Sequence, residues 1–211
     1  MIAIIDTGAK NIGSILNALR YLNIKNELVQ KPKDLKRKFT HIILPGVGNF
    51  EKVIKTLSKK GFNKKTLTQI AQQKKLLAIC VGFQILFTES EESKHKGINL
   101  FKGSFKDLKK LGCQDNVPHV GFNSIKLKFK NEIEYLNKKD FYFIHKFALD
   151  EKQVNFDNKK ILVGKTTHGK TTFISIIISK NLIATQFHPE KSGLPGIKLF
   201  KYFYGKKKSY I

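Results

Sequence analysis

The chain has 211 residues, of which 40 are lysine or arginine and 16 are aspartate or glutamate, so its formal net charge is +24 at pH 7. This length suffices for one α/β domain with a sizeable core, and no apolar run is long enough to span a membrane. Only two basic residues are arginines and the lysines are spread along the chain, which indicates a compositional bias rather than a nucleic-acid-binding face. Two cysteines make no disulfide framework and no secretory signal precedes the first predicted strand, so we expect a cytoplasmic protein.

The first half of the chain alternates predicted strands and helices. Residues 1–6 form an apolar strand pattern, and apolar residues at spacings of three and four between Ile12 and Leu22 predict a helix. Further elements are expected as strands at 27–30, 40–44 and 76–79 and helices at 49–57, 63–73 and 83–87. This alternation is typical of a parallel sheet that helices cover on both faces.

The second half changes in texture after Gly97. Short alternating stretches predict strands at 101–108, 123–129, 141–147, 162–165, 171–179 and 181–187, and a closing helix at 196–203. The lysine run at 206–208 predicts a solvated tail. We therefore expect one α/β domain over residues 1–211, a doubly wound and mostly parallel sheet flanked by helices, with antiparallel strands added in the second half.

One segment of the first half has the layout of a nucleophile elbow. The apolar run at 76–79 leads into Cys80, and a buried helix is predicted soon after it. A tight bend between strand and helix exposes the residue at the bend, and the free N–H groups of the helix start favour thiolate over thiol. A lone cysteine is otherwise best explained as a buried structural residue. The segment thus predicts a thiol nucleophile if a base lies near it.

A candidate base lies near the other end of the chain. His188 follows the predicted strand 181–187, and Glu190 comes two residues later, after Pro189. The imidazole can take the thiol proton, and the carboxylate can bond the other ring nitrogen and fix its tautomer. An isolated His-X-Glu is usually a solvated pair. Together with a cysteine elbow, however, it predicts the catalytic set Cys80, His188 and Glu190.

Acyl transfer to a thiol also needs N–H donors that stabilise the oxyanion of the tetrahedral intermediate. The N–H of Val81, directly after the nucleophile, is one candidate. The other is expected from the PGVG loop at 45–48, at Val47 or Gly48, because glycine permits unusual φ angles. By itself this loop predicts only a tight strand-to-helix turn. Beside a cysteine elbow we favour the oxyanion role.

Taken together, these motifs resemble the class I glutamine amidotransferases, whose glutaminase reaction uses Cys, His and Glu. The resemblance covers essentially the whole chain and is closest to the glutaminase subunit of imidazole glycerol phosphate synthase, which acts in histidine biosynthesis. The motifs that carry it are IAIID at 2–6, LPGVGNF at 44–50, AICVGFQ at 78–84, ESEE at 89–92, VPHVGFN at 117–123, YFIH at 142–145 and QFHPEKSG at 186–193.

By this resemblance the substrate is L-glutamine. It would be held by Gly48, Gln84 and Glu92, with main-chain help from Lys146 and Phe147. Glu92 suits the substrate ammonium and Gln84 suits polar substrate atoms, although an ordinary polar surface residue would give the same pattern, above all for Glu92. No cofactor and no metal are implied.

The resemblance also implies a partner, the (β/α)8-barrel cyclase subunit of the synthase, in a heterodimer. The cyclase would receive ammonia through a tunnel and make imidazole glycerol phosphate and aminoimidazole carboxamide ribotide. The positions expected to face the barrel are Asn11, Pro118, His119, Phe122, Tyr142 and Lys191. Packing within the domain explains an apolar Phe122 equally well. Neither a nucleic acid nor a membrane is expected as a partner.

Several positions depart from the family pattern, although the three triad residues match it. Ala78 and Lys10 stand where glycine is usual, Thr7 where tyrosine is, Phe122 where tryptophan is, and Lys146 and Phe147 where serine or threonine precedes tyrosine. These departures leave two alternatives open. The first is a paralogue that supplies ammonia to a cyclase-like partner in another pathway, such as amidination of a surface sugar. The second is a non-catalytic scaffold with the same fold.

Overall fold

A computed structural model of the chain describes residues 1–127, 133–154, 156 and 161–205. The predicted tail at 206–208 and the last two positions of the predicted strand 123–129 lie outside these residues. Among the described residues, no helix is both long and apolar enough to cross a membrane.

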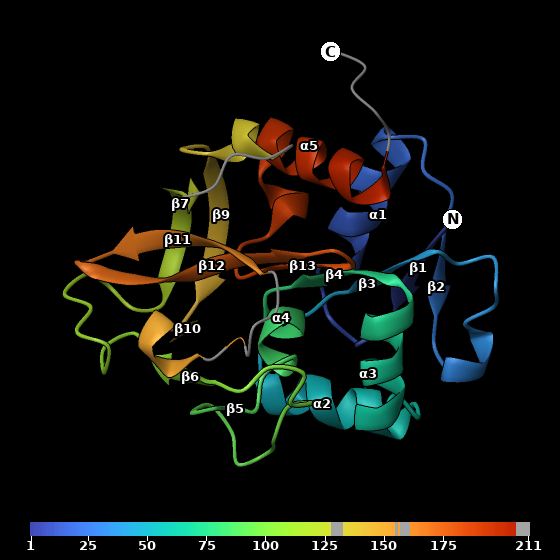
Figure 1. The fold of residues 1–211 in the computed structure, drawn as a ribbon, viewed down its shortest axis with the longest axis horizontal. Helices are drawn as coiled ribbons and strands as arrows, with labels where there is room; N and C mark the ends of the chain where they lie inside the picture. Colours follow the sequence, from blue (N-terminus) through green and yellow to red (C-terminus); the bar gives the residue numbers. More distant parts are fainter. Residues whose placement is uncertain (128–132, 155, 157–160, 206–211) are drawn as a thin grey trace.

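The first half of the chain builds the parallel part of the main sheet (Figure 1). Strand β1 pairs in parallel with β2 and β3, and β3 pairs in parallel with β4. The elements of this half are β1 (Ile2–Ile5), α1 (Ile12–Tyr21), β2 (Asn26–Val29), β3 (His41–Leu44), α2 (Phe50–Lys59), α3 (Lys64–Gln73), β4 (Lys75–Ile79), α4 (Val81–Ile85) and β5 (Glu89–Ser90).

The second half extends the same sheet with mostly antiparallel strands and adds a separate two-stranded sheet of β7 and β9. The sheet order is β2-β1-β3-β4-β13-β12-β10-β6-β5, with β11 beside β12 and β8 beside β11. The elements of this half are β6 (Ser104–Asp107), β7 (His119–Ser124), β8 (Lys126–Leu127), β9 (Asp140–His145), β10 (Phe147–Leu149), β11 (Leu162–His168), β12 (Thr171–Ser179), β13 (Leu182–Thr185) and α5 (Gly193–Tyr204).

Strands β4 and β13 lie side by side at the centre of the sheet. They pair in parallel, with Ile79 opposite Thr185, and four of the five residues of β4 and all four of β13 are buried. Helices α1 and α5 cover one face of the sheet and α2, α3 and α4 cover the other (Figure 1). Strands buried on both faces are expected to be continuous apolar runs, as these are. The predicted fold class is confirmed.

Some predicted boundaries were wrong. Helix α4 begins at Val81 rather than Phe83 and ends at Ile85, because Cys80 itself makes the bend. The predicted strand 141–147 is two strands, since the chain passes at Lys146 from the small sheet, where β9 pairs with β7, to the main sheet, where β10 pairs with β6. The predicted strand 123–129 starts four residues too late, because β7 already begins at His119. The predicted strand 101–108 shortens to β6, which follows Gly103 at a positive φ of 155°.

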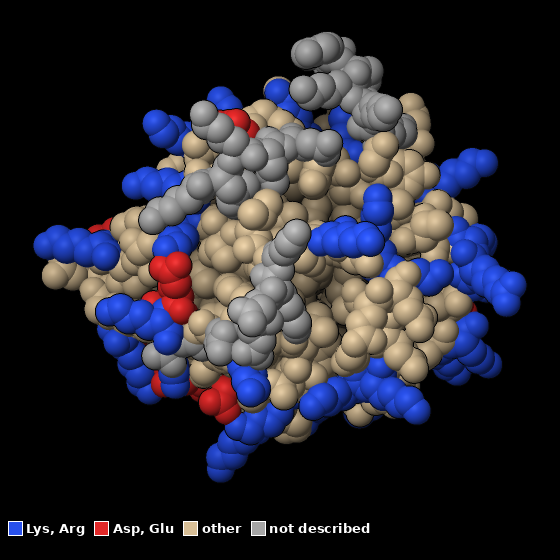
Figure 2. Space-filling view, in the orientation of Figure 1, with Lys and Arg blue, Asp and Glu red and all other residues tan. Residues whose placement is uncertain are grey.

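The basic side chains do not gather into one patch on the face shown in Figure 2. Lysines and arginines are scattered over it, interrupted by uncharged surface and a few acidic groups. This distribution agrees with the interpretation of the +24 charge as a compositional bias.

Candidate active site

Cys80 lies at a strained bend between β4 and α4. Its backbone has φ 52° and ψ −108°, a region that L-residues other than glycine rarely adopt. Its N–H donates to the carbonyl of Thr185 at 2.7 Å, which ties the bend to the end of β13. The thiol is 2% exposed. The predicted elbow is therefore present, with the cysteine held at the carboxyl end of two central strands.

Two glycines bring the PGVG loop against this elbow. A Cβ on Gly82 would lie 2.2 Å from the carbonyl oxygen of Leu44, and a Cβ on Gly46 would lie 2.6 Å from the Gly82 nitrogen. Only glycine fits at both positions, because no real Cβ comes that close to the backbone. Val47 and Gly48 follow directly, and Gly48 has a positive φ of 94°. The loop and the first turn of α4 are thus packed backbone to backbone.

His188 and Glu190 lie just beyond β13, and both side chains are fully buried. Nδ1 of His188 is 2.7 Å from Oε1 of Glu190. The main chain of His188 is held at both ends, since its N–H donates to the Tyr142 carbonyl at 2.8 Å and its carbonyl accepts from the Ser192 hydroxyl at 2.6 Å. Nδ1 must carry a proton to bond a carboxylate, so Nε2 is the nitrogen left to act on a thiol.

The groups around the His188 ring set its pKa. Burial of the ring by itself lowers the pKa of His188, but the negative charges of Cys80 and Glu190 outweigh it and raise the pKa to about 10. Nε2 has no hydrogen-bond partner of ordinary geometry among the described residues. At neutral pH the ring therefore carries the proton that a leaving amine needs.

Asn11 joins this set through a contact that the sequence did not reveal. Its Nδ2 donates to Oε1 of Glu190 at 2.7 Å, the same oxygen that bonds His188. Asn11 precedes α1 and is 3% exposed, so its side chain does not lie on the surface as a partner-facing residue would. The carboxylate is consequently oriented from two sides.

Gln186 was also missed. It is fully buried, and its Nε2 donates to the Cys80 sulfur at 3.5 Å while its Oε1 accepts from Gln84 Nε2 at 3.3 Å. Gln84 is itself buried, and its Oε1 has no hydrogen-bond partner within the part of the chain that the structure describes. The signal in the sequence was a glutamine inside an otherwise apolar strand pattern, because buried amides usually serve a specific hydrogen bond.

Glu92 lies beside the PGVG loop rather than on an open helix surface. Its carboxylate accepts from Asn49 Nδ2 at 2.8 Å and from the Phe50 N–H at 3.1 Å, at the start of α2. Burial raises the pKa of Glu92, and these hydrogen bonds and the charge of Lys146 offset that effect only in part. Lys146 forms an ion pair with Asp107, with 3.1 Å between Nζ and Oδ2. The carbonyl oxygen of Phe147 lies 2.9 Å from Nδ1 of His145.

The residues expected at a partner face divide into two groups. Phe122 is 62% exposed, contacts Tyr142 edge to face with ring centroids 5.6 Å apart, and lies on β7 near the exposed Pro118. The ammonium of Lys191 is 5.5 Å from the centroid of the Tyr142 ring. His119, by contrast, is 3% exposed and points inward, as Asn11 does. The first group forms a surface and the second does not.

Within the described residues, no group of three or more His, Cys, Asp or Glu side chains is arranged to hold a metal ion.

Comparisons with known proteins agree with this arrangement. The family model described as glutamine amidotransferase class-I matches residues 3–205. The chain therefore belongs to this family.

The relatives at the sequence level carry a more particular name. The chain is 36% identical over 207 residues to the protein named imidazole glycerol phosphate synthase subunit HisH of Dehalococcoides mccartyi, covering 97% of this chain and 96% of that one. It is 35% identical to the protein named imidazole glycerol phosphate synthase hisHF of Schizosaccharomyces pombe, covering 96% of this chain but 38% of that longer one. A solved structure described as a glutamine amidotransferase has the same fold, with a TM-score of 0.72, 16% identity and 97% coverage of both chains.

Proposed function

We propose that this chain is the glutaminase subunit of an imidazole glycerol phosphate synthase. It hydrolyses L-glutamine to glutamate and ammonia and passes the ammonia to a cyclase subunit in histidine biosynthesis. The observation that carries the proposal is the strained Cys80 elbow beside a buried His188 whose ring is bonded to Glu190 at 2.7 Å. The full-length relatives named subunit HisH support the choice of pathway. The proposal treats residues 1–211 as one domain, and because a thiol nucleophile must stay reduced, we expect it to work in the cytoplasm.

In this proposal the reaction starts from a Cys80 thiolate and a protonated His188. The Cys80 thiolate attacks the side-chain amide carbon of glutamine, and the oxyanion forms. The C–N bond then breaks as protonated His188 gives its proton to the leaving nitrogen, which releases ammonia and leaves a γ-glutamyl thioester on Cys80. Neutral His188 next takes a proton from water, whose oxygen attacks the thioester carbon. The C–S bond breaks, glutamate leaves, and the thiolate–imidazolium pair is restored.

The N–H groups of the elbow and the PGVG loop are the proposed oxyanion donors. The Val81 N–H lies in the first turn of α4, where helical N–H groups have no acceptor within the helix. The Val47–Gly48 peptide supplies the second donor in this proposal, supported by the close packing of Gly46 on Gly82. In the same proposal Gly48, Gln84 and Glu92 hold the substrate, together with the main chain of Lys146 and Phe147.

A partner is part of the proposal because free ammonia is mostly protonated at neutral pH and diffuses away. We assign the exposed surface of Phe122, Tyr142, Pro118 and Lys191 as the docking face for a (β/α)8-barrel cyclase. The Schizosaccharomyces pombe relative, of which this chain matches 38%, is a longer protein that bears the name of the synthase, which supports a second polypeptide for the remaining activity here. The cyclase would receive the ammonia through a tunnel.

One observation favours a second candidate function. Lys146 stands where the family usually has a hydroxyl, and its ammonium is paired with Asp107 and acts on Glu92. A changed substrate face fits a paralogue that delivers ammonia to a different cyclase-like partner.

Two experiments test these proposals. An electrophilic glutamine analogue is expected to label the wild type but not Cys80→Ala, and absence of labelling in the wild type would reject a glutaminase and leave the scaffold alternative. Expression in a histidine auxotroph lacking this subunit is expected to restore growth. Labelling without complementation would instead favour the paralogue.

A further inference from the structure

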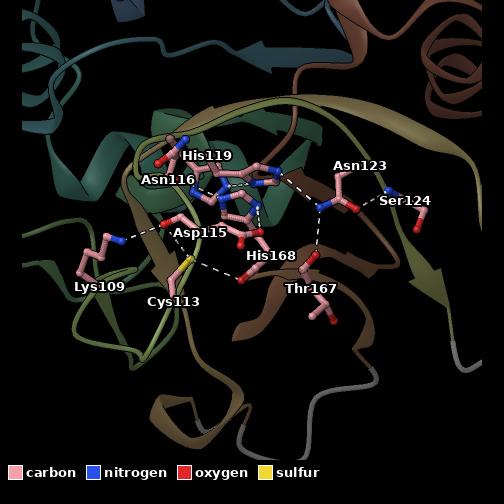
Figure 3. A network of polar contacts seen from close by, with 10 residues as sticks. Lys109, Cys113, Asp115, Asn116, His119, Asn123, Ser124, Thr167 and His168 are labelled. Carbon is pink, nitrogen blue, oxygen red and sulfur yellow. Dashed lines mark hydrogen bonds and ion pairs between the residues drawn. The ribbon is translucent and has the colours of Figure 1, made fainter. Parts of the chain in front are cut away.

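The ring of His119 contacts two other histidine rings, and the three residues come from three different strands. His119 comes from β7, His145 from β9 and His168 from β11. Figure 3 shows His119 and His168 with the polar groups around them. The rings of His119 and His168 are stacked, with centroids 4.0 Å apart and planes 18° apart. Nδ1 of His119 is 3.2 Å from Nε2 of His145. None of these rings takes part in the thiol chemistry described above.

The hydrogen bonds around His119 and His145 can run in only one direction. Nδ1 of His145 is 2.9 Å from the carbonyl oxygen of Phe147, which can only accept, so that nitrogen carries the proton. Nε2 of neutral His145 must then accept from Nδ1 of His119. This leaves Nε2 of His119 as an acceptor, and Nδ2 of Asn123 lies 3.4 Å from it while donating to the Thr167 carbonyl at 2.9 Å. One choice of tautomers, with the proton on Nδ1 of both His119 and His145, satisfies all of these hydrogen bonds.

The charge state of the two rings keeps this direction constant near neutral pH. Burial lowers the pKa of His119 to about 4, helped by the facing His168 and opposed by Asp115. Burial likewise lowers the pKa of His145 to about 3. The hydrogen bond to the Phe147 carbonyl opposes this shift, and the facing His119, His168 and His188 add to it. A protonated ring would have no acceptor nitrogen, and the hydrogen bond that it accepts would be lost. Both imidazoles must therefore be neutral for this series of hydrogen bonds to form.

The last acceptor in this series of hydrogen bonds, the Phe147 carbonyl, lies in the segment that the proposed function assigns to glutamine binding. The Phe147 carbonyl belongs to the first residue of β10, directly after Lys146, where the backbone passes from the small sheet to the main sheet. A peptide that binds substrate through its main chain must be held in one orientation, and the His145 N–H holds this carbonyl.

We propose that His119 is a positioning residue for glutamine binding, acting through the directed chain Asn123 to His119 to His145 to the Phe147 carbonyl. The inference rests on the proposed function, because it takes the main chain of Lys146 and Phe147 to hold glutamine. His119 itself touches no reacting atom. It fixes His145 as an Nδ1–H tautomer, which in turn fixes the peptide.

The first test observes the tautomers directly in the wild-type chain. Nitrogen-15 NMR of labelled histidines at pH 7 is expected to show both His119 and His145 as neutral Nδ1–H tautomers, assigned with the variants His119→Asn and His145→Asn. A neutral Nε2–H form at either ring, or a charged ring, would overturn the directed chain. This measurement uses the folded wild type, so it does not depend on any variant being stable.

The second test separates binding from chemistry with an electrophilic glutamine analogue that labels Cys80. His119→Leu removes the donor and is expected to raise the concentration for half-maximal labelling rate about tenfold, as for a buried acceptor left unpaired, with the maximal rate within about twofold. His119→Asn places an amide N–H near the position of Nδ1 and is expected to restore the wild-type concentration dependence. The matched control is His168→Phe, which keeps a stacked ring outside the chain and is expected to behave as the wild type.

The outcomes separate failure of the proposed glutaminase function from failure of the positioning role of His119. If the wild type is not labelled, the proposed glutaminase function fails. If the wild type is labelled and folded His119→Leu binds the analogue equally well, or if His168→Phe weakens binding as much, the positioning role fails and the glutaminase stands.

Discussion

Two buried histidine sites in this molecule are driven to opposite protonation states. Burial by itself lowers the pKa of both His188 and His145. At His188 the charges of Cys80 and Glu190 outweigh burial and raise the pKa to about 10. At His145 the neighbours are the Phe147 carbonyl and other imidazoles, and the pKa falls to about 3. The identity of the neighbours, more than depth, therefore decides whether a buried ring serves as an acid or as a fixed hydrogen-bond donor.

Removing the sulfur should have the largest effect on this contrast. Cys80→Ala is expected to reduce glutaminase activity by at least about 10⁴-fold, because the nucleophile is lost. It should also lower the pKa of His188, which NMR titration would report. Cys113→Ala is the matched control, since that buried thiol lies outside the candidate site. An unchanged His188 titration in Cys80→Ala would contradict the thiolate pairing.

Displacing the Cys80 sulfur without removing it should cause the second-largest loss of activity. Gly82→Ala would place a Cβ 2.2 Å from the Leu44 carbonyl oxygen, so the elbow that carries Cys80 has to shift. A displacement of this kind is expected to cost about 10²-fold in kcat. Gly13→Ala, in α1 with nothing within 4 Å of its Cβ, should keep full activity and melt slightly higher. Equal activity of the two variants would show that the close approach is not required.

Removing one of the two hydrogen bonds to the Glu190 carboxylate should lower activity by less. Asn11→Leu removes the second donor to Glu190 and is expected to lower kcat about tenfold, the size of a lost hydrogen bond to a charged group. Asn17→Ala on the same helix is the control. The side chain of Asn17 accepts a hydrogen bond from Arg20 at the surface, and within the described residues no hydrogen bond joins it to the candidate site. Steady-state glutaminase rates would measure both, and a wild-type rate in Asn11→Leu would remove Asn11 from the site.

The two sites should also give stability opposite slopes with pH. Between about pH 4 and 6.5 an unfolded His119 binds a proton that the folded ring refuses, so the free energy of unfolding falls as pH falls through this window. His188 does the reverse, since its folded pKa is raised and its contribution is lost as pH rises through about 10. His119→Asn should reduce the loss of stability between pH 7 and 5 by about 2 kcal/mol in denaturant titrations. Cys80→Ala should flatten only the alkaline side, and a change on the acid side alone would contradict the assignment.

Much of the fold could be predicted because its signals are local. The alternation of apolar runs with helical spacing marked the parallel strands β1, β3 and β4. Asn49 and Asn63 cap α2 and α3 at the starts of the predicted helices 49–57 and 63–73. The elbow and the His-Pro-Glu segment were visible because a few consecutive residues specify each bend. The break at Lys146 was missed, since a run of alternating residues does not say which of two sheets it joins.

Most elements, the elbow and the His188–Glu190 pair could be predicted from the sequence, because backbone sterics and residue spacing act over a few positions. Which distant residues meet could be seen only in the folded chain. Asn11 bonds Glu190 across 179 positions, Gln186 reaches Cys80 across 106, and His119 finds His145 through the pairing of β7 with β9. Those contacts depend on the order and register of strands, and these are set by burial of the whole sheet rather than by any one segment.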